Sequence, residues 1–167
     1  MTELHNKLID NSSEEFSMLN TLKQCFEIKD LHTIRIATGY WDIPGMALIA
    51  DELEVFLKQN NAKLQLLIGK DPYIFAHDLK QPKYKGSNYP DDFIRTDINE
   101  LDIKAEYEKV VRLLLDYCTD KTDSKVQIRV YTKKKNGKEQ FLHSKCYIFT
   151  KDGYSCGIIG SSNFTAK

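Results

Sequence analysis

Stretches with the pattern of β-strands alternate with stretches with the pattern of helices along most of the chain. In residues 31–40, Ile34 and Ile36 alternate with other residues, which is the period-2 pattern of a strand. Residues 63–69 form a nearly continuous apolar run, as expected for a strand buried at a parallel position, and residues 126–131 form a third run. This alternation predicts an α/β domain of layered α-β-α architecture, with a mostly parallel or mixed central sheet.

The segments between these runs carry signals for helices and for one long loop. Residues 12–15 have the pattern of a capping box and precede apolar residues at helical spacing. Pro44 suits the first turn of a second helix, whose apolar side we expect to include Leu48. Residues 70–90 are rich in turn signals and predict a loop, whereas residues 91–118 predict further helix.

Two hairpins are expected in the last third of the chain. The Asn136-Gly137 dipeptide is a strong turn signal within residues 133–138. Residues 140–149 and 154–159 then form two strand-like runs that are joined across Asp152-Gly153.

The last of these hairpins carries the residues that point to a function. His143 and Lys145 are two positions apart, so period-2 spacing places them on one face of the predicted strand. A hairpin would bring Ser161 and Asn163, which follow Gly160, near that face. An imidazole, an ammonium, a hydroxyl and an amide would then converge, and such a set can hold a phosphate and attack it.

The pattern HxK followed by GSxN resembles the HKD signature of the phospholipase D superfamily. The chain is most similar to the phospholipase D-like domains of bacterial DNA helicases and of metal-independent restriction endonucleases. The segment IRIATGYWDIPGMALIADEL resembles the strand, loop and helix that open these domains, and KLQLLIG resembles their second strand. The superfamily has an Asp five residues after the Lys, where this chain has Thr150, and Asp152 is out of register. Several helicase-linked members resemble the chain in lacking that Asp.

The resemblance implies a phosphodiesterase or nuclease that acts on DNA without metal or cofactor. His143 would be the nucleophile, which would form a phosphohistidine. Lys145 and Asn163 would hold the non-bridging oxygens, with donors from Ser161 and Ser162. A second histidine must protonate the leaving oxygen.

Only the HxK pattern at His143 has the motif context, since His5, His32 and His77 lack it, and this bears on the assembly of the chain. We therefore expect a homodimer that shares one active site, or a second motif beyond Lys167. The resemblance also implies that residues 1–167 are one domain, at the N-terminal end of a larger cytoplasmic protein with helicase domains or of a restriction system.

Two other functions remain open from the sequence. The first is a catalytically silent module that binds nucleic acid or dimerises and retains the phospholipase D-like fold; Thr150 favours it. The second is lipid hydrolysis, which we rank low because no amphipathic membrane-binding segment is evident. His143 alone would more often be a hydrogen-bonded core residue than a nucleophile.

Weaker signals concern nucleic-acid contacts. Lys133, Lys134 and Lys135 form the densest basic run, either a contact to DNA phosphates or a solvated turn. Tyr40 and Trp41 follow a strand end, where they could stack on a base or pack in the core. The 24 basic and 24 acidic residues of the whole chain balance, so a strongly basic DNA-binding protein is not indicated.

The remaining features argue against metal sites and membrane spans. The four cysteines have no zinc-binding spacing, and we expect them to be reduced and buried, with a cross-strand disulfide between Cys146 and Cys156 as the alternative. His77 next to Asp78 lacks a third ligand, so we expect no metal. No apolar stretch is long enough to span a membrane.

Overall fold

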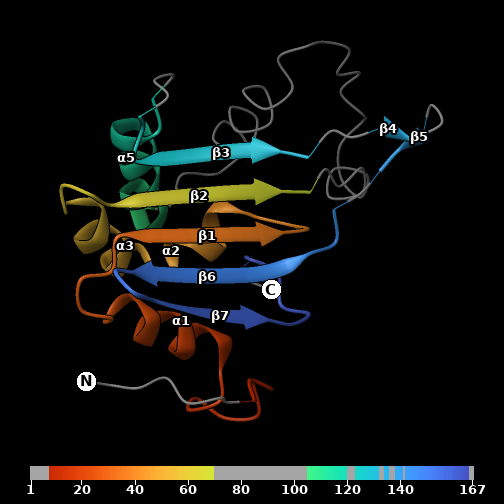
Figure 1. Ribbon diagram of the computed structural model, residues 1–167, viewed down its shortest axis with the longest axis horizontal. Helices are drawn as coiled ribbons and strands as arrows, with labels where there is room; N and C mark the ends of the chain where they lie inside the picture. Colours follow the sequence, from red (N-terminus) through yellow and green to blue (C-terminus); the bar gives the residue numbers. More distant parts are fainter. Residues whose placement is uncertain are drawn as a thin grey trace.

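The structure is a computed structural model that describes residues 8–69, 105–119, 123–131, 134–135, 138–140 and 142–165. Its centre is a five-stranded sheet with the order β3-β2-β1-β6-β7 (Figure 1). The strands are β1 (Thr33–Thr38), β2 (Lys63–Ile68), β3 (Val126–Val130), β6 (Lys145–Lys151) and β7 (Tyr154–Ile159). The helices are α1 (Met18–Phe26), α2 (Ile43–Ala47), α3 (Ala50–Leu57) and α5 (Ala105–Tyr117).

The sheet is mixed, with parallel strands in one half and antiparallel strands in the other. Strands β1, β2 and β3 are parallel, and helices connect them. Strand β6 is antiparallel to β1 and pairs with β7 across Asp152-Gly153, where Gly153 has a φ of 70°. The predicted α/β fold with a mixed sheet and a C-terminal hairpin is thus confirmed.

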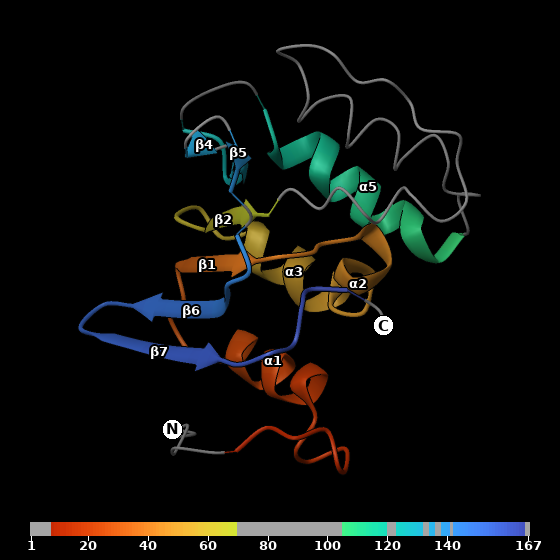
Figure 2. The ribbon, with the colours of Figure 1, turned by 90° about the vertical axis from the view of Figure 1, so that its right-hand side faces the viewer.

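The described helices cover one face of the sheet (Figure 2). Alternate residues of the strands, such as Ile34 and Ile36 of β1, point into the core beneath them and are almost fully buried. The ring of Phe26 in α1 packs edge-on against Phe56 of α3 at 6.0 Å and against Phe149 of β6 at 6.1 Å. These contacts fix α1 and α3 on the same side of the sheet.

Helix α1 begins later than the capping box predicted. Its N-cap is Ser17, whose hydroxyl accepts a hydrogen bond from the amide of Asn20 at 3.1 Å. The prediction that residues 12–15 cap this helix is therefore wrong. Those residues form turns and bends instead, and the side chain of Asn11 accepts from the amide of Met18 at 2.8 Å.

The helix predicted around Pro44 is two short helices. Asp42 caps α2 by accepting from the amide of Gly45 at 2.7 Å, with Pro44 in the first turn as expected. The helical conformation is interrupted at residues 48–49, before α3 begins. At this interruption Ile49 is buried in the core. Leu48, which we predicted on the apolar side of the helix, is instead 46% exposed.

Strand β6 is shorter at its beginning than predicted. It begins at Lys145 rather than at residue 140, because Lys145 pairs with Thr38, the last residue of β1. His143 therefore precedes the strand. The hairpin arms expected around Asn136-Gly137 are present as β4 (Lys134–Lys135) and β5 (Lys138–Glu139).

Several sequence predictions fall on residues that the structure does not describe. The loop predicted at 70–90 and the helix predicted at 91–104 lie outside the described residues. The described part of that helical region is α5. None of the described helices is long and apolar enough to cross a membrane.

The alternative of a disulfide between Cys146 and Cys156 is wrong. Cys146 pairs with Ile159, whereas Cys156 pairs with Phe149, three positions further along β6. An odd offset places the two thiols on opposite faces of the sheet. All four cysteines are free thiols, as predicted, but only Cys25 is buried, so the expected burial of Cys118, Cys146 and Cys156 is wrong.

Candidate active site at the carboxyl-terminal edge of β1

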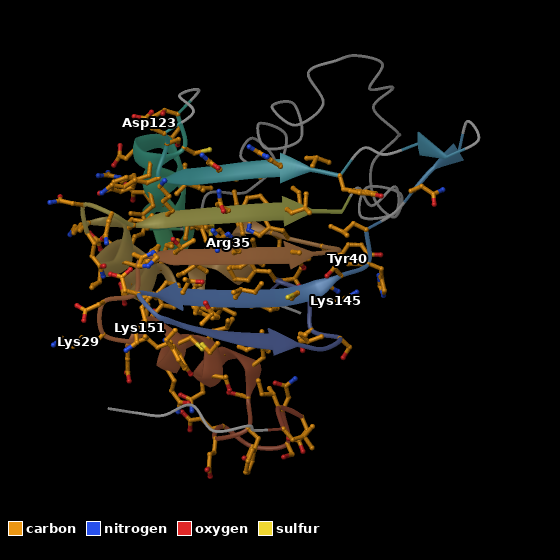
Figure 3. The ribbon with its side chains drawn as sticks, in the orientation of Figure 1. Lys29, Arg35, Tyr40, Asp123, Lys145 and Lys151 are labelled. Atoms are coloured by element: carbon orange, nitrogen blue, oxygen red, sulfur yellow. The ribbon has the colours of Figure 1, made fainter. Side chains whose placement is uncertain are left out.

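The motif residues gather at the edge of the sheet where β1 ends and β6 begins. Figure 3 shows Tyr40 and Lys145 together at this edge. The amide of Gly160, just after β7, donates to the carbonyl of Lys145 at 3.2 Å. The amide of Phe164 lies 3.3 Å from the Tyr40 carbonyl. These contacts bring the segment after β7 back to the end of β1.

His143 and Lys145 are in direct contact. The ammonium nitrogen Nζ of Lys145 lies 3.0 Å from Nδ1 and 2.9 Å from Nε2 of His143. It also donates to the carbonyl oxygen of His143 at 3.3 Å. The imidazole is exposed, whereas Lys145 is only 6% exposed. An accessible imidazole is thus in contact with a buried ammonium.

Burial also affects the charge on Lys145. Loss of hydration lowers the pKa of its ammonium from the ordinary value of 10.5. Among the described residues, no carboxylate forms an ion pair with Lys145. A buried cation without a counter-charge is costly unless an anion binds beside it. The local electrostatics therefore favour an anion next to His143.

Asn163 is fixed by the backbone at the end of β1. Its Oδ1 accepts a hydrogen bond from the amide of Tyr40 at 3.2 Å, and Thr38 Oγ1 lies 3.5 Å from the same oxygen. With the oxygen used in this way, the NH₂ group of Asn163 is the part that can donate to a phosphate. Because Thr38 pairs with Lys145, the amide and the ammonium lie at neighbouring positions.

Two polar residues that the sequence did not single out support this arrangement. Thr38 is fully buried, and its hydroxyl lies 2.7 Å from the Tyr40 carbonyl and accepts from the amide of Phe164 at 3.2 Å. Tyr147, two residues after Lys145, donates its hydroxyl to the carbonyl of Ser162 at 3.0 Å. A threonine at the end of the strand, in step with the alternating apolar residues Ile34 and Ile36, was the available signal.

The two serines of the motif occupy different environments. Ser161 is exposed and Ser162 is half-buried. Both line a groove of about 320 Å³, which is also lined by apolar residues of α1. No hydrogen bond joins either serine to Lys145 within the described part of the chain. Their expected donor roles therefore remain predictions.

A glycine allows this segment to lie close to α2. A Cβ atom added to Gly45 would lie 2.6 Å from Cα and 2.7 Å from the carbonyl carbon of Thr165. Distances this short require the backbone to move. Gly45 therefore permits the close approach that holds Asn163 beside β1.

Thr150, which replaces the motif Asp, lies far from the site. It pairs with Thr33 at the opposite end of β1, five residues or about 17 Å from Lys145. Asp152 is exposed at that same end, where its carboxylate lies 3.3 Å from Nε2 of His32. Neither residue can touch a phosphate held at His143.

The residues that the sequence predicted to contact nucleic acid lie in different environments. Tyr40 is half-buried at the site, but Trp41 is 3% exposed, so the stacking role predicted for Trp41 is wrong and the packing alternative holds. Lys133 and the side chains of Lys134 and Lys135 lie outside the described residues, as do His77 and Asp78. No cluster of metal-ligating side chains occurs among the described residues.

Comparison with known families agrees with the fold. A family model described as cardiolipin synthase, PLD-like domain, matches residues 18–167. A comparison with curated proteins gives no match. The matched range contains every described helix and strand and all of the motif residues. The chain therefore belongs to the family of phospholipase D-like domains.

Proposed function

We propose that this domain hydrolyses phosphodiester bonds without a metal ion and that His143 is the nucleophile. The contact of Lys145 Nζ with the ring nitrogens of His143, at 2.9 and 3.0 Å, is the observation that carries the proposal. The ammonium is buried and lacks a carboxylate partner among the described residues, so a phosphate would supply its counter-charge. The exposed imidazole next to it is accessible to a substrate.

The proposed reaction has two displacements at phosphorus. A ring nitrogen of His143 attacks with its lone pair, the bond to the leaving oxygen breaks, and that oxygen takes a proton from a second histidine. Water then gives a proton to the second histidine and attacks the phosphohistidine, which releases His143. Lys145 and the NH₂ group of Asn163 stabilise the non-bridging oxygens in both steps.

The second histidine is the part of the mechanism that this chain must obtain elsewhere. Within the described residues the other histidine is His32, which adjoins Thr33 at the far end of β1. At about 3.3 Å per residue it lies more than 15 Å from Lys145. We propose a homodimer in which two His143 residues face each other across one site. A second motif further along a longer chain is the alternative.

DNA is the substrate that we propose. The support is the likeness of residues 34–53 to the opening segment of phospholipase D-like domains in helicases and metal-independent restriction endonucleases. On this view the domain works at the N-terminal end of a helicase or restriction protein. Tyr40 at the site and Lys133, Lys134 and Lys135 would contact the DNA.

A catalytically silent binding module is the second candidate. It is favoured by the single imidazole among the described residues of the site, since one chain can bind a phosphate but cannot protonate the leaving group. The distance of Thr150 from the site removes one argument for it, because an Asp at that position would not reach the phosphate.

A metal-free nuclease assay with two histidine variants tests the proposal. Purified wild type, His143→Ala and the matched control His32→Ala are incubated with labelled single- and double-stranded DNA in EDTA. We expect cleavage and an acid-labile phosphohistidine in the wild type and in His32→Ala, and neither in His143→Ala. Cleavage that persists in His143→Ala would refute a histidine nucleophile. DNA binding without cleavage in the dimeric wild type would support the silent module.

A further inference from the structure

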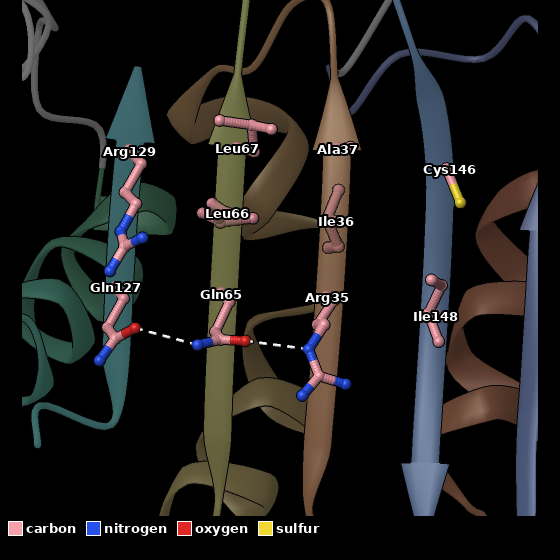
Figure 4. Close-up of a pocket in the computed structure, with 10 residues that line it drawn as sticks. All are labelled: Arg35, Ile36, Ala37, Gln65, Leu66, Leu67, Gln127, Arg129, Cys146 and Ile148. Carbon is pink, nitrogen blue, oxygen red and sulfur yellow. Dashed lines mark hydrogen bonds between the residues drawn. The ribbon is translucent and has the colours of Figure 1, made fainter. Parts of the chain in front are cut away.

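The face of the sheet opposite the described helices carries side chains that the proposed catalysis does not use. Strand register aligns them in rows across the sheet (Figure 4). One row contains Cys146, Ala37, Leu67 and Arg129. The next row contains Ile148, Arg35, Gln65 and Gln127. We call this surface, together with the residues of β7 that continue the rows, the open face.

One half of the open face is apolar. In β6 and β7, Cys146 pairs with Ile159, and Ile148 pairs with Gly157. Ile159 is 85% exposed, and the thiol and the two aliphatic side chains form a continuous strip along the two strands. Gly157 has no side chain, so the surface of the strip is recessed at this position. A Cβ added there would meet only the carbonyl oxygen of Tyr147, at 3.6 Å.

The other half of the open face, on β1, β2 and β3, carries polar and positively charged side chains beside the apolar Ala37 and Leu67. Nε of Arg35 donates to Oε1 of Gln65 at 3.0 Å, and Nε2 of Gln65 donates to Oε1 of Gln127 at 3.0 Å. This ladder holds the Arg35 guanidinium in place while its two terminal nitrogens take no part in it. Arg129 and Lys63 are exposed on the same face. No carboxylate belongs to the rows of the open face or forms an ion pair with these three cations among the described residues.

A parallel sheet normally has both faces covered, because an uncovered face leaves apolar side chains in water. A cavity of about 390 Å³ lies over the open face and is lined by Arg35, Gln65, Arg129 and Ile148, among others. We propose that the open face is a docking site for a partner protein. The partner would present an amphipathic helix whose apolar stripe covers β6 and β7 and whose carboxylate-bearing flank faces Arg35, Arg129 and Lys63.

The dimensions of the face fit one such helix. Strands of six or seven residues are about 20 Å long at 3.3 Å per residue, which is the length of a helix of about 13 residues. The apolar half is two strands wide, or about 10 Å with its borders, which is the width of a helix. A carboxylate on the flank would meet the pre-oriented fork of Arg35, which binds carboxylates through two parallel hydrogen bonds.

Two other occupants fit less well. A two-fold dimer through this face would bring together two copies of a surface whose rows contain cations but no carboxylates. Positive charges would then meet across the interface. A nucleic acid would leave the apolar half uncovered. Single strands also bind through aromatic platforms, and the described residues of the open face include no aromatic side chain.

The partner helix can be sought with a displayed library of helical peptides of about four turns, randomised on one side. In selections on the wild type we expect enrichment of an apolar stripe with Glu or Asp along one flank. The variant Arg35→Glu/Arg129→Glu should bind the selected peptides at least tenfold more weakly and should instead enrich Lys and Arg. Arg112→Glu, which reverses an exposed charge on α5, is the matched control and should bind like the wild type.

Alkylation of Cys146 locates the peptide without a variant. A selected peptide should slow modification of Cys146 at least fivefold and leave the rate at Cys118 unchanged. Selected helices without acidic enrichment, or no protection of Cys146, would overturn the proposal. Stronger protection by DNA, or protection by self-association without peptide, would overturn it in favour of nucleic acid or a second copy. None of these readouts depends on catalysis, so a failure here is distinct from a failure of the proposed phosphodiesterase function.

Discussion

Lys145 combines a structural cost with a role that the chemistry requires. Its side chain points to the helix-covered face, as those of Tyr147 and Phe149 do, and the residue is almost fully removed from water. A lysine without function at this position would be replaceable by an apolar residue of similar length. The buried charge is therefore the strongest support for the proposed phosphate site.

We expect Lys145→Met to be more stable than the wild type by about 1 kcal/mol at pH 7, because it removes a buried cation that has no carboxylate partner among the described residues. The lowered pKa of Lys145 means that the unfolded chain binds more protons than the folded protein just below pH 10.5. Wild-type stability therefore rises with pH in this window, and the advantage of the variant shrinks as the pH approaches 10.5.

Urea unfolding at pH 7 and at pH 10 measures both effects on Lys145→Met, and phosphate binding is measured in parallel. We expect phosphate binding to be lost. Greater stability of the wild type at pH 7 would contradict this account, as would phosphate affinity that is unchanged in the variant.

At the residue scale, the motif predicted the candidate site but not the residues that support it. His143, Lys145 and Asn163 were identifiable because their spacing is local and characteristic. Thr38 and Tyr147 were not, since each acts through a contact with a distant segment. Thr38 lies 125 residues from Asn163 in sequence, and only the pairing of β1 with β6 brings them together.

At the scale of single elements, α1 shows how a local signal can mislead. Ser12-Ser-Glu-Glu15 satisfies the capping-box pattern, but the first turn forms after Ser17. The hydroxyl of Ser17 also donates to the carbonyl of Glu14 at 2.8 Å, so it stabilises the turn that leads into the helix. Sequence pattern cannot rank two candidate caps, because the choice depends on where Leu22 and Cys25 must enter the core.

We expect Ser17→Ala to lower the free energy of unfolding by about 1 kcal/mol, the usual effect of losing an N-cap. Ser12→Ala is the matched control and should change it by less than about 0.5 kcal/mol, as for an ordinary surface position. Chemical denaturation of both variants provides the comparison. Equal effects would mean that the cap does not stabilise α1.

The contact between α2 and the segment after β7 gives a second prediction at this scale. Gly45→Ala forces a Cβ to within 2.6 Å of the Thr165 backbone, so we expect a loss of about 1–3 kcal/mol in stability together with loss of activity as Asn163 moves. Gly157→Ala adds the same methyl group at ordinary contact distance and should be tolerated. Unfolding and phosphate-binding measurements on the pair separate the two. Full phosphate binding by Gly45→Ala would show that this close approach does not position Asn163.

At the scale of the whole molecule, the strand pattern was predictable because apolar runs and their spacing are encoded locally. The order β3-β2-β1-β6-β7 was not, because strand order depends on long-range pairing. The helix-covered face could be recognised from alternate apolar positions. The composition of the open face became visible only once register aligned Arg35, Gln65 and Gln127 across three strands.

A shared active site makes the proposed reaction depend on protein concentration. If two copies complete the site, specific activity in EDTA should rise with concentration and reach a plateau where sedimentation shows only dimer. Mixing in an excess of His143→Ala subunits should depress wild-type activity beyond simple dilution. Activity per mole that is constant in a purely monomeric sample would show that one chain suffices.

The insertion of β6 beside β1 has a consequence for the chain during its synthesis. Strand β1 gains β2 soon after leaving the ribosome, but its other edge waits for Lys145, 107 residues after Thr38 (145 − 38). At about 5–20 residues per second that interval is about 5–20 s, during which the central strand has an unpaired edge that can capture other chains. The strand that closes this edge starts at Lys145, so the proposed phosphate site cannot assemble in a nascent chain before β6 begins to cover the edge of β1.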